Sequence, residues 1–315
     1  MITIQIQKEE AGRKLARFLE KLLPKAPRGI FHKALRNKKI KVNGKKPADL
    51  TGIINEGDEI RIFFTEEQLI SFGYSANPPR KKKKDVFYPS VPIIYEDDQL
   101  LILDKPAGML SQKSKPEDIS LNEIGCNMIE QRQGSIKGYR PGVCNRLDRN
   151  TAGAVIMAKT LQAGQAVSKM LREHYLGKFY WALVEGVPQK WQNETTLIHG
   201  WNKDEIQNKV ELITWSENLV GYQRIESKVR FLRSYDTYSL VEIQLLTGKS
   251  HQIRSQLAAE GHPILQDGKY NPNAKEYRPM LVAKRLEFKN CIAPLQYMEG
   301  KIVEAVTPKA MEKFL

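Results

Sequence analysis

The stretch Asn145-Arg146-Leu147-Asp148-Arg149-Asn150-Thr151-Ala152-Gly153 leads directly into the apolar run Ala154-Val155-Ile156-Met157-Ala158. An apolar run of this length predicts a buried strand, so the charged residues lie on the loop that enters a core strand. Such loops commonly carry catalytic side chains, because a rigid element holds them in place. Asp148 is the one acid of the loop, and the positive charge of its arginine neighbours favours the ionised carboxylate. In isolation, an Arg-Leu-Asp tripeptide would more often be a salt bridge within a loop.

Other segments share the apolar and charged character of the Asp148 loop and occur around it in a fixed order. They are Leu103-Asp104-Lys105-Pro106-Ala107-Gly108, then Gly177-Lys178-Phe179-Tyr180-Trp181-Ala182-Leu183-Val184-Glu185-Gly186, then Thr247-Gly248-Lys249-Ser250-His251-Gln252-Ile253-Arg254 with Gly261-His262-Pro263-Ile264. Together with the Asp148 loop they resemble the motifs of the RluA-type family of RNA pseudouridine synthases. The resemblance extends from about Pro92 to about Phe288, which is most of the chain.

This resemblance implies an α+β fold, in which a mixed, mainly antiparallel central sheet has flanking helices. It also implies three catalytic residues. Asp148 would be the carboxylate that acts on the nucleoside, and Tyr180 would stack on the flipped base or accept its proton. Arg254 would pair with Asp148, since an arginine stays charged and can grip a carboxylate with two parallel hydrogen bonds.

The implied reaction is the isomerisation of uridine within RNA. The bond between the sugar and the base nitrogen breaks, the base rotates and rejoins through carbon 5, and the hydrogen on carbon 5 leaves. This needs an ionised carboxylate, a water-poor pocket and a proton acceptor, and we expect no cofactor and no metal. Whether Asp148 attacks the sugar or promotes a glycal-like intermediate stays open.

Further residues of the same segments are candidates for RNA binding. Arg146 is placed to fill the gap that an extruded uridine leaves in its stack. The other candidates in the catalytic segments are Arg149, Lys178, His251 and Gln252. His251 and His262 are too few and too scattered for a metal site.

The chain departs from the family pattern at several positions. Asn145 replaces the usual His, Ala152 a Ser, Lys249-Ser250 an Arg-Thr pair, Val282 a His and Gln266 a Gly. None of these changes removes a charge that the reaction needs. Asn145 and Ala152 do put the hydrogen bonding of the loop, and its RNA preference, in question.

Composition and charge indicate a globular protein that binds a polyanion. The 315 residues are 41% hydrophobic and 27% charged, with a net charge of +14. Residues 1–85 hold 20 Lys and Arg against 10 Asp and Glu, whereas the rest hold 30 against 26. A basic end on a nearly balanced body is typical of a nucleic-acid-binding appendage. A solubilising surface is the alternative.

The appendage itself has a recognisable pattern. Helices are predicted around Leu15–Leu22 and Arg28–Asn37, and a tight turn at Asn43-Gly44 follows the strand Ile40-Lys41-Val42. Two helices and a small basic hairpin resemble the S-four-like, or alpha-L, RNA-binding domain. Its expected RNA-binding residues are Arg28, Lys33, Arg36, Lys38, Lys39 and Lys41. Such phosphate contacts position RNA without reading its sequence.

Three parts are therefore predicted: the RNA-binding domain over 1–70, a basic flexible linker over 71–90, and the catalytic domain over 91–315. The linker contains Arg80-Lys81-Lys82-Lys83-Lys84, a run that should not pack. Further along, strands are expected near Arg230–Arg233 and Ser239–Leu245. A helix is expected from the N-cap Ser250 to Glu260, ended by Gly261. His174 is expected to be a packed or capping residue of the helix that starts near Thr160.

Several general properties follow from what the chain lacks. No segment resembles a signal peptide or a membrane span, so we expect a cytoplasmic protein. Cys126, Cys144 and Cys291 have no paired spacing and should be reduced and mostly buried thiols. A monomer is the default.

Two other functions stay open: a non-catalytic RNA-binding ribosome assembly factor on the same fold, and a nucleic-acid enzyme of different chemistry, such as a glycosylase. The N-terminal pattern favours large-subunit ribosomal RNA as substrate and transfer RNA next. Which RNA and which uridine are modified is not in the sequence.

Overall fold

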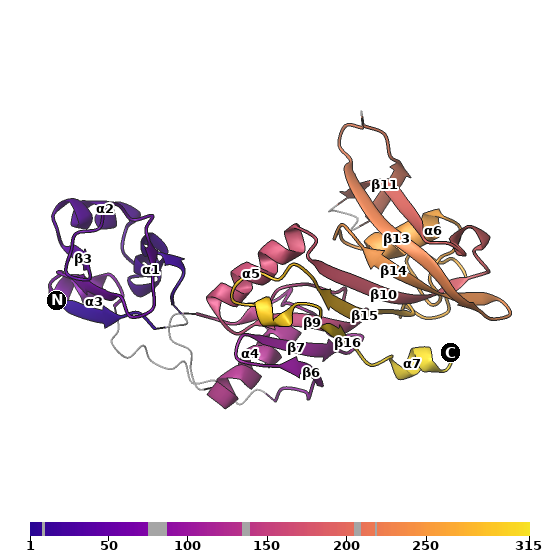
Figure 1. Cartoon of the computed structure of the whole chain (residues 1–315), viewed down its shortest axis with the longest axis horizontal. Helices are drawn as coiled ribbons and strands as arrows, with labels where there is room; N and C mark the ends of the chain where they lie inside the picture. The colour runs from indigo at the N-terminus through magenta and orange to yellow at the C-terminus, as the bar shows by residue number, and fades with distance from the viewer. Residues whose placement is uncertain (8–9, 75–86, 134–138, 205–208, 218) are drawn as a thin grey trace.

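The computed structural model describes residues 1–7, 10–74, 87–133, 139–204, 209–217 and 219–315. Figure 1 shows a small N-terminal unit beside a larger unit built on one long sheet. The basic run at 80–84, which was predicted to be a linker, lies outside the described residues. Among the helices of the described part, none combines the length and apolarity needed to cross a bilayer.

The N-terminal unit has its own hydrophobic core, which includes Phe18, Leu19, Phe31 and Ile60. Its elements are β1 (Ile2–Gln5), β2 (Arg13–Lys14), α1 (Leu15–Leu22), α2 (Arg28–Arg36), β3 (Ile40–Val42), β4 (Ile53–Ile54), β5 (Glu59–Ile62) and α3 (Glu66–Ser71). Both predicted helices are present, because their apolar residues recur at helical spacing and face this core.

Two details of this unit differ from expectation. Asn43 and Gly44 form the expected tight turn, with φ angles of 50° and 75° and paired backbone hydrogen bonds between Val42 and Lys45, but this hairpin stops at that bridge and β3 pairs along its length with β5. Helix α3 was not predicted. It begins with Thr65, whose hydroxyl accepts from the Gln68 amide while the Gln68 side chain accepts from Thr65 N–H, a capping box.

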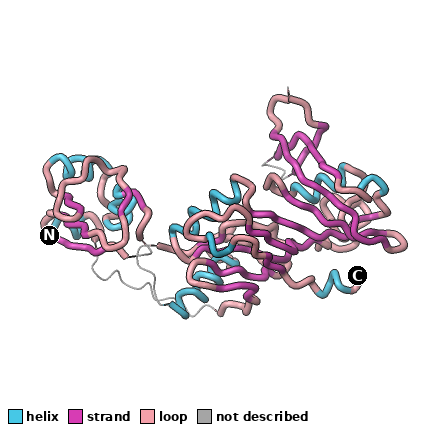
Figure 2. Tube along the Cα trace, viewed as in Figure 1, coloured by secondary structure: helices cyan, strands magenta, loops and turns pink. Residues whose placement is uncertain are grey.

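The larger unit contains an eleven-stranded sheet in the order β12-β11-β13-β14-β10-β15-β9-β7-β6, with β16 on β15 and β8 on β9 (Figure 2). Its strands are β6 (Ile93–Glu96), β7 (Leu100–Lys105), β8 (Gly142–Val143), β9 (Ala152–Ala158), β10 (Leu176–Glu185), β11 (Thr195–Asp204), β12 (Lys209–Thr214), β13 (Gln223–Ser234), β14 (Tyr238–Leu245), β15 (Leu281–Phe288) and β16 (Ile302–Glu304). The α+β fold with a mixed, mainly antiparallel sheet is therefore confirmed.

Helices cover both faces of this sheet. They are α4 (Leu121–Gln133), α5 (Leu161–Arg172), α6 (Gln252–Ala259) and α7 (Lys309–Glu312), with short 3-10 turns at Gln189–Trp191 and Gln296–Met298. Alternate residues of β9 separate two cores: Val155 and Met157 pack with α4, whereas Ala154 and Ile156 pack with α5. β9 is thus buried on both sides, as its continuous apolar run predicts.

The pairing of β9 with β15 is parallel, whereas the other strand pairs in the described residues are antiparallel. Gly153 at the start of β9 lies opposite Ala283 of β15. A Cβ atom on Gly153 would stand 2.3 Å from the Ala283 carbonyl oxygen, and its φ is 116°. Only glycine fits this contact, so the exit of the Asp148 loop is fixed tightly to β15.

Three local predictions need correction in whole or in part. Ser250 is not the N-cap of α6; His251 occupies that position, with a left-handed φ of 56° and no capping side-chain bond. His174 is exposed, so it is not packed, but it does cap α5: it follows the last helical turn with a left-handed φ of 59°, and the next N–H, of Tyr175, donates to the Met170 carbonyl at 2.8 Å. The three cysteines are free but only partly buried. By contrast, Gly261 ends α6 with a φ of 85°, as predicted.

Candidate active site

Asp148 lies in the turn between β8 and β9, where the chain enters the buried strand. The Thr151 amide donates to the Asp148 carbonyl at 3.1 Å and closes this turn. The Asp148 side chain is 32% exposed, so its carboxylate is reachable from solvent while protein surrounds most of it. A carboxylate presented in this way can contact a substrate and still be oriented by its neighbours.

Lys105 lies fully buried beneath this turn. Its ammonium donates to three carbonyl oxygens, of Pro106 at 3.1 Å, Met109 at 2.7 Å and Arg149 at 2.9 Å. Burial lowers the pKa of Lys105 to about 8, although the charge of Asp148 acts in the opposite direction. Lys105 therefore joins the β7 turn to the residue that follows Asp148, and it supplies positive charge below the carboxylate.

Asn145 and Ser111 hold the first half of the loop. The Asn145 amide donates to the Ala154 carbonyl at 3.2 Å and accepts from the Ile156 N–H at 2.8 Å. The Ser111 hydroxyl donates to the Leu147 carbonyl at 2.8 Å and accepts from its N–H at 3.0 Å. Asn145, which replaces a histidine of the family pattern, thus keeps the loop bonded to β9.

Arg254, on α6, contacts two carboxylates. Its Nη1 lies 3.3 Å from Asp148 Oδ2, while Nε and Nη2 each donate to Asp267 at 2.7 Å. The expected pair of hydrogen bonds to Asp148 is therefore wrong in detail: the two-pronged contact is made with Asp267, and Asp148 receives one longer bond. Burial opposes the charge of Arg254, but the hydrogen bonds and charges of Asp267 and Asp148 raise its pKa above the ordinary value.

Tyr180 is brought to the loop by strand register. It lies opposite Ala283 of β15, which in turn lies opposite Gly153, where the Asp148 loop ends. Its ring is 6% exposed, and among the described residues its hydroxyl makes no hydrogen bond. Burial and then the charge of Asp148 raise the Tyr180 pKa, so the phenol is neutral beside the carboxylate.

His251 lies between Asp148 and Tyr270. Its Nε2 is 3.9 Å from Asp148 Oδ2, and its Nδ1 is 2.9 Å from the Tyr270 hydroxyl. Burial, with the charges of Arg254 and Lys269, lowers the His251 pKa to about 4, against the opposite effect of Asp148. The ring is therefore neutral at pH 7. The guanidinium of Arg254 also lies 5.2 Å above the Tyr270 ring, so His251, Arg254 and Tyr270 form one packed group.

The other predicted RNA-binding residues of this unit have different environments. Arg146 and Arg149 are exposed on the Asp148 loop. Lys178 is partly covered, and burial lowers its pKa. Gln252 is 2% exposed, accepts from Thr247 and Lys249, and donates to the Glu226 carbonyl. These bonds hold the Thr247–Gln252 turn together. They occupy the buried Gln252 amide, which is therefore not presented to RNA as predicted.

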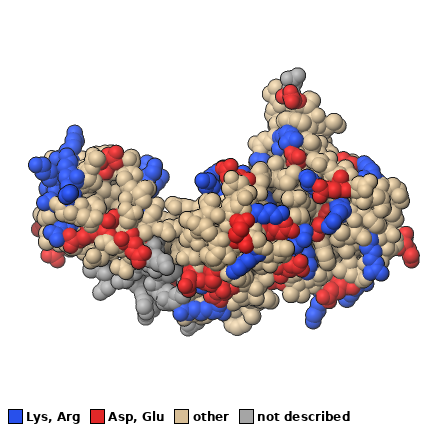
Figure 3. Space-filling model, in the orientation of Figure 1, with Lys and Arg blue, Asp and Glu red and all other residues tan. Residues whose placement is uncertain are grey.

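Lys and Arg gather at one end of the N-terminal unit, over α2 and β3 (Figure 3). The six predicted residues of this basic surface, which we call the α2 surface, are Arg28, Lys33, Arg36, Lys38, Lys39 and Lys41. Five are exposed, and Lys41 is half-buried with its ammonium 5.6 Å from the Phe63 ring centre. Arg28 also reaches Glu20 at 3.2 Å, a surface pair of little energetic weight.

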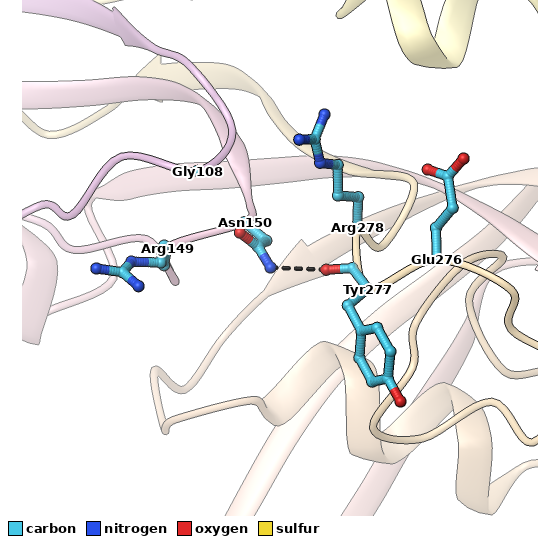
Figure 4. Close-up of a pocket in the computed structure, with 6 residues that line it drawn as sticks. All are labelled: Gly108, Arg149, Asn150, Glu276, Tyr277 and Arg278. Carbon is cyan, nitrogen blue, oxygen red and sulfur yellow. Dashed lines mark hydrogen bonds between the residues drawn. The ribbon is translucent and has the colours of Figure 1, made fainter.

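An open pocket of about 680 Å³ adjoins the Asp148 loop and is lined by Gly108, Arg149, Asn150, Glu276, Tyr277 and Arg278. Figure 4 shows Arg149 and Asn150 on one side of it and Glu276, Tyr277 and Arg278 on the other. We call it the Arg149 pocket. No cluster of potential metal ligands occurs among the described residues.

Three contributors to this site were missed in the sequence: Lys105, Asp267 and Tyr270. Lys105 and Asp267 lie within or beside recognised motifs, but nothing in their local sequence says that they are fully buried. The detectable signal was Asp267 itself, an acid two residues after the apolar Pro263-Ile264-Leu265 run. Its partner becomes evident only when α6 is folded onto the turn that contains Asp267.

Comparison with known proteins shows the family to which this fold belongs. The family described as RNA pseudouridylate synthase matches residues 99–259, which include Asp148, Tyr180 and Arg254. Because this match spans half of the chain, the protein belongs to the RNA pseudouridine synthase family. It is thus an RNA-modifying isomerase.

Relatives match over nearly the whole chain. An uncharacterized RNA pseudouridine synthase of Mycoplasma capricolum is 26% identical over 309 residues, 95% of each chain. The ribosomal large subunit pseudouridine synthase C of Vibrio cholerae is 29% identical, covering 85% of this chain and 79% of its own. The structure of human RNA pseudouridylate synthase domain containing 4 has a TM-score of 0.55 at 22% identity, covering 70% of this chain and 90% of that one. This last similarity concerns the fold.

Proposed function

We propose that the protein converts specific uridines of large-subunit ribosomal RNA to pseudouridine, with Asp148 as the carboxylate that acts on the nucleoside. The observation that carries the proposal is the 3.3 Å contact between Arg254 and a partly exposed Asp148 carboxylate. A guanidinium at this distance orients the carboxylate, which can then meet the sugar from a fixed position.

Tyr180 and Arg254 have separate parts in this proposal. Arg254, itself held by Asp267, keeps Asp148 oriented. The Tyr180 ring borders the loop, so it can stack on the extruded base, and its neutral hydroxyl can relay the proton from carbon 5 by passing its own proton to water as it takes that proton up. Arg146, exposed on the same loop, would fill the space that the uridine leaves.

The reaction balances without net oxidation or reduction. The bond between C1′ and N1 breaks, the base rotates, and C1′ bonds to C5. The C5 proton then leaves, and N1 takes up a proton. In these steps the protein orients the nucleoside, supplies the charged carboxylate and provides the proton acceptor.

The choice of ribosomal RNA rests on relatives and on charge. Relatives near 28% identity are named for the large ribosomal subunit, including those of Vibrio and Salmonella. The α2 surface of the N-terminal unit would bind the phosphate backbone, with residues 1–70 as an RNA-binding domain, 71–90 as a linker and 91–315 as the catalytic domain. Backbone contacts of this kind give affinity that falls steeply with salt.

Mapping pseudouridines tests the proposal. Ribosomal and transfer RNA would be sequenced from cells that have the protein, lack it, or carry only Asp148→Asn. We expect one or more large-subunit sites to disappear in the last two strains. Modification retained with Asp148→Asn would disprove the role of Asp148. A loss of pseudouridine confined to transfer RNA would overturn the choice of ribosomal RNA as the substrate. No loss at any site would favour an assembly factor without catalytic activity.

A further inference from the structure

The Arg149 pocket joins two distant segments of the chain. Arg149 and Asn150 directly follow Asp148, whereas Glu276, Tyr277 and Arg278 precede β15. The Asn150 side chain donates to the Tyr277 carbonyl at 2.7 Å, as Figure 4 shows. This bond fixes the position of the pocket relative to Asp148, so a group bound there would be held beside the reacting nucleoside.

Tyr277 offers an aromatic surface in this pocket. Its side chain is 74% exposed, which is unusual for a tyrosine. The ring nevertheless packs on the backbone of Gly268, where an added Cβ would stand 2.2 Å from Cδ1 of the ring. A paired backbone bridge between Asp267 and Tyr277 holds the same place. A ring supported on one side and open on the other is suited to stacking on a nucleobase.

The charges of the pocket suit a phosphate. Arg149 and Arg278 are exposed and come from the two opposite segments, and Glu276 is the single acid among the lining residues. Figure 4 shows the two guanidinium groups pointing in different directions, so each would bind a phosphodiester by itself, with paired hydrogen bonds. Glu276 disfavours a second phosphate beside the first. The pocket is therefore matched to one nucleotide better than to a long tract of backbone.

We propose that the Arg149 pocket binds the nucleotide adjacent to the target uridine, with its base on Tyr277 and its phosphate on Arg278. The site would help to select which uridine enters the active site, because only RNA that places a free base there gains this contact. This inference rests on the proposed function, which supplies the RNA substrate. It adds Tyr277 and Arg278 as residues that determine specificity and take no part in the chemistry.

Steady-state kinetics of single-residue variants test the pocket. The probe is RNA purified from cells that lack the protein, and pseudouridine is measured at the position that mapping identifies. Tyr277→Ala and Arg278→Ala are expected to raise KM about 10-fold and to leave kcat within about twofold. Arg278→Ala should also reduce the slope of log KM against log salt by about 1.

Two variants serve as matched controls. Tyr277→Phe keeps the ring and should keep the wild-type KM. Lys275→Ala removes a positive charge from the same segment, but Lys275 is exposed and does not line the pocket. Its KM and salt slope should stay at wild-type values. Thermal denaturation checks folding, and ultraviolet cross-linking of bound RNA to the wild-type protein, read by mass spectrometry, should mark Tyr277 without any substitution.

The outcomes separate this inference from the proposed function. An unchanged KM in both Tyr277→Ala and Arg278→Ala overturns nucleotide binding in the Arg149 pocket but leaves the proposed function standing, provided that Asp148→Asn still abolishes modification. An equal rise in KM for Lys275→Ala also overturns it, because the effect would then be one of general charge. A loss of kcat at constant KM would assign Tyr277 or Arg278 to the chemistry and likewise contradict the inference.

Discussion

The guanidinium of Arg254 and the carboxylate of Asp267 form a buried pair, joined by two hydrogen bonds of 2.7 Å. The Asp267 side chain is completely buried, and Arg254 is 12% exposed. This pair leaves one nitrogen of Arg254 to reach Asp148. The orientation of Arg254 at the candidate active site is therefore set by a carboxylate that does not meet the substrate.

Removing the charge of Asp267 should affect both stability and rate. Asp267→Asn leaves Arg254 buried without its close partner, and breaking such a pair typically costs about 3 kcal/mol of unfolding free energy. Arg254 would also be free to turn toward Asp148 in another geometry. We expect a lower melting temperature and a kcat reduced about 10-fold or more, measured by denaturation and single-turnover kinetics.

Asp148→Asn provides the comparison for this variant. Asp148 is about one-third exposed and accepts one longer bond, so its loss should change stability by less than about 1 kcal/mol while abolishing the reaction. If Asp267→Asn left both the stability and the reaction rate at wild-type values, the proposed orienting role of Asp267 would be wrong.

The burial of Lys105 should make stability depend on alkaline pH. Its pKa is about 8 in the folded protein against 10.5 for an unburied lysine. Between these values the unfolded chain binds the proton more tightly, so stability rises as pH increases from 8 to 10.5 and the gain is absent below pH 8. The shift corresponds to about 3 kcal/mol.

Lys105→Met removes this titration and keeps an unbranched chain in the site. The difference in unfolding free energy between the native protein and Lys105→Met should therefore move in favour of the native protein as pH rises through this window. Urea denaturation at pH 7.5, 9 and 10 measures it. A difference that stays constant with pH would show that Lys105 keeps an ordinary pKa.

His251 should produce a pH dependence on the acidic side. Its pKa falls from 6.5 to about 4 on folding, so the unfolded chain takes up a proton first. The stabilisation is complete above pH 6.5 and is lost as pH falls toward 4, by up to about 3 kcal/mol. His251→Asn, which tolerates the left-handed φ, should flatten this part of the stability curve. His32→Asn, on the exposed side of α2, should leave it unchanged.

Gly268 supports the Tyr277 ring, so adding a methyl group there should displace the ring. Because Tyr277 is largely exposed, the ring can move away at little cost, and Gly268→Ala should change the melting temperature only slightly. The variant should nevertheless raise KM for RNA in the same direction as Tyr277→Ala. A normal KM, with the ring shown by crystallography to be displaced, would remove Tyr277 from substrate binding.

Much of the architecture could be predicted from the sequence. The apolar run after Gly153 and the run containing Tyr180 specify two core strands by composition alone, and Gly261 marks the end of α6. The contact between Asp148 and Arg254 was expected from motifs that lie about a hundred residues apart. The structure brings these side chains together, with one bond in place of the two expected.

Other features depend on tertiary packing and have no local signal. Gln252 belongs to a polar motif, but its amide satisfies the backbone of its own turn and of β13, which buries it. Lys105 ends a strand, where lysines are usually exposed, and only the convergence of three carbonyls makes its burial possible. Ser250 is a good N-cap by composition, yet its carbonyl accepts from the Trp201 indole and the helix begins one residue later.

The position of β15 has a consequence for synthesis of the protein. This strand lies in the sheet between β9 and β10, although it follows them in the chain by about a hundred residues. A chain still emerging from the ribosome can form the Asp148 turn and the Tyr180 strand, but it has nothing to insert between them until Phe288 has been translated. An unfinished copy should therefore be inert toward RNA, and competence should arrive only after β15 has emerged.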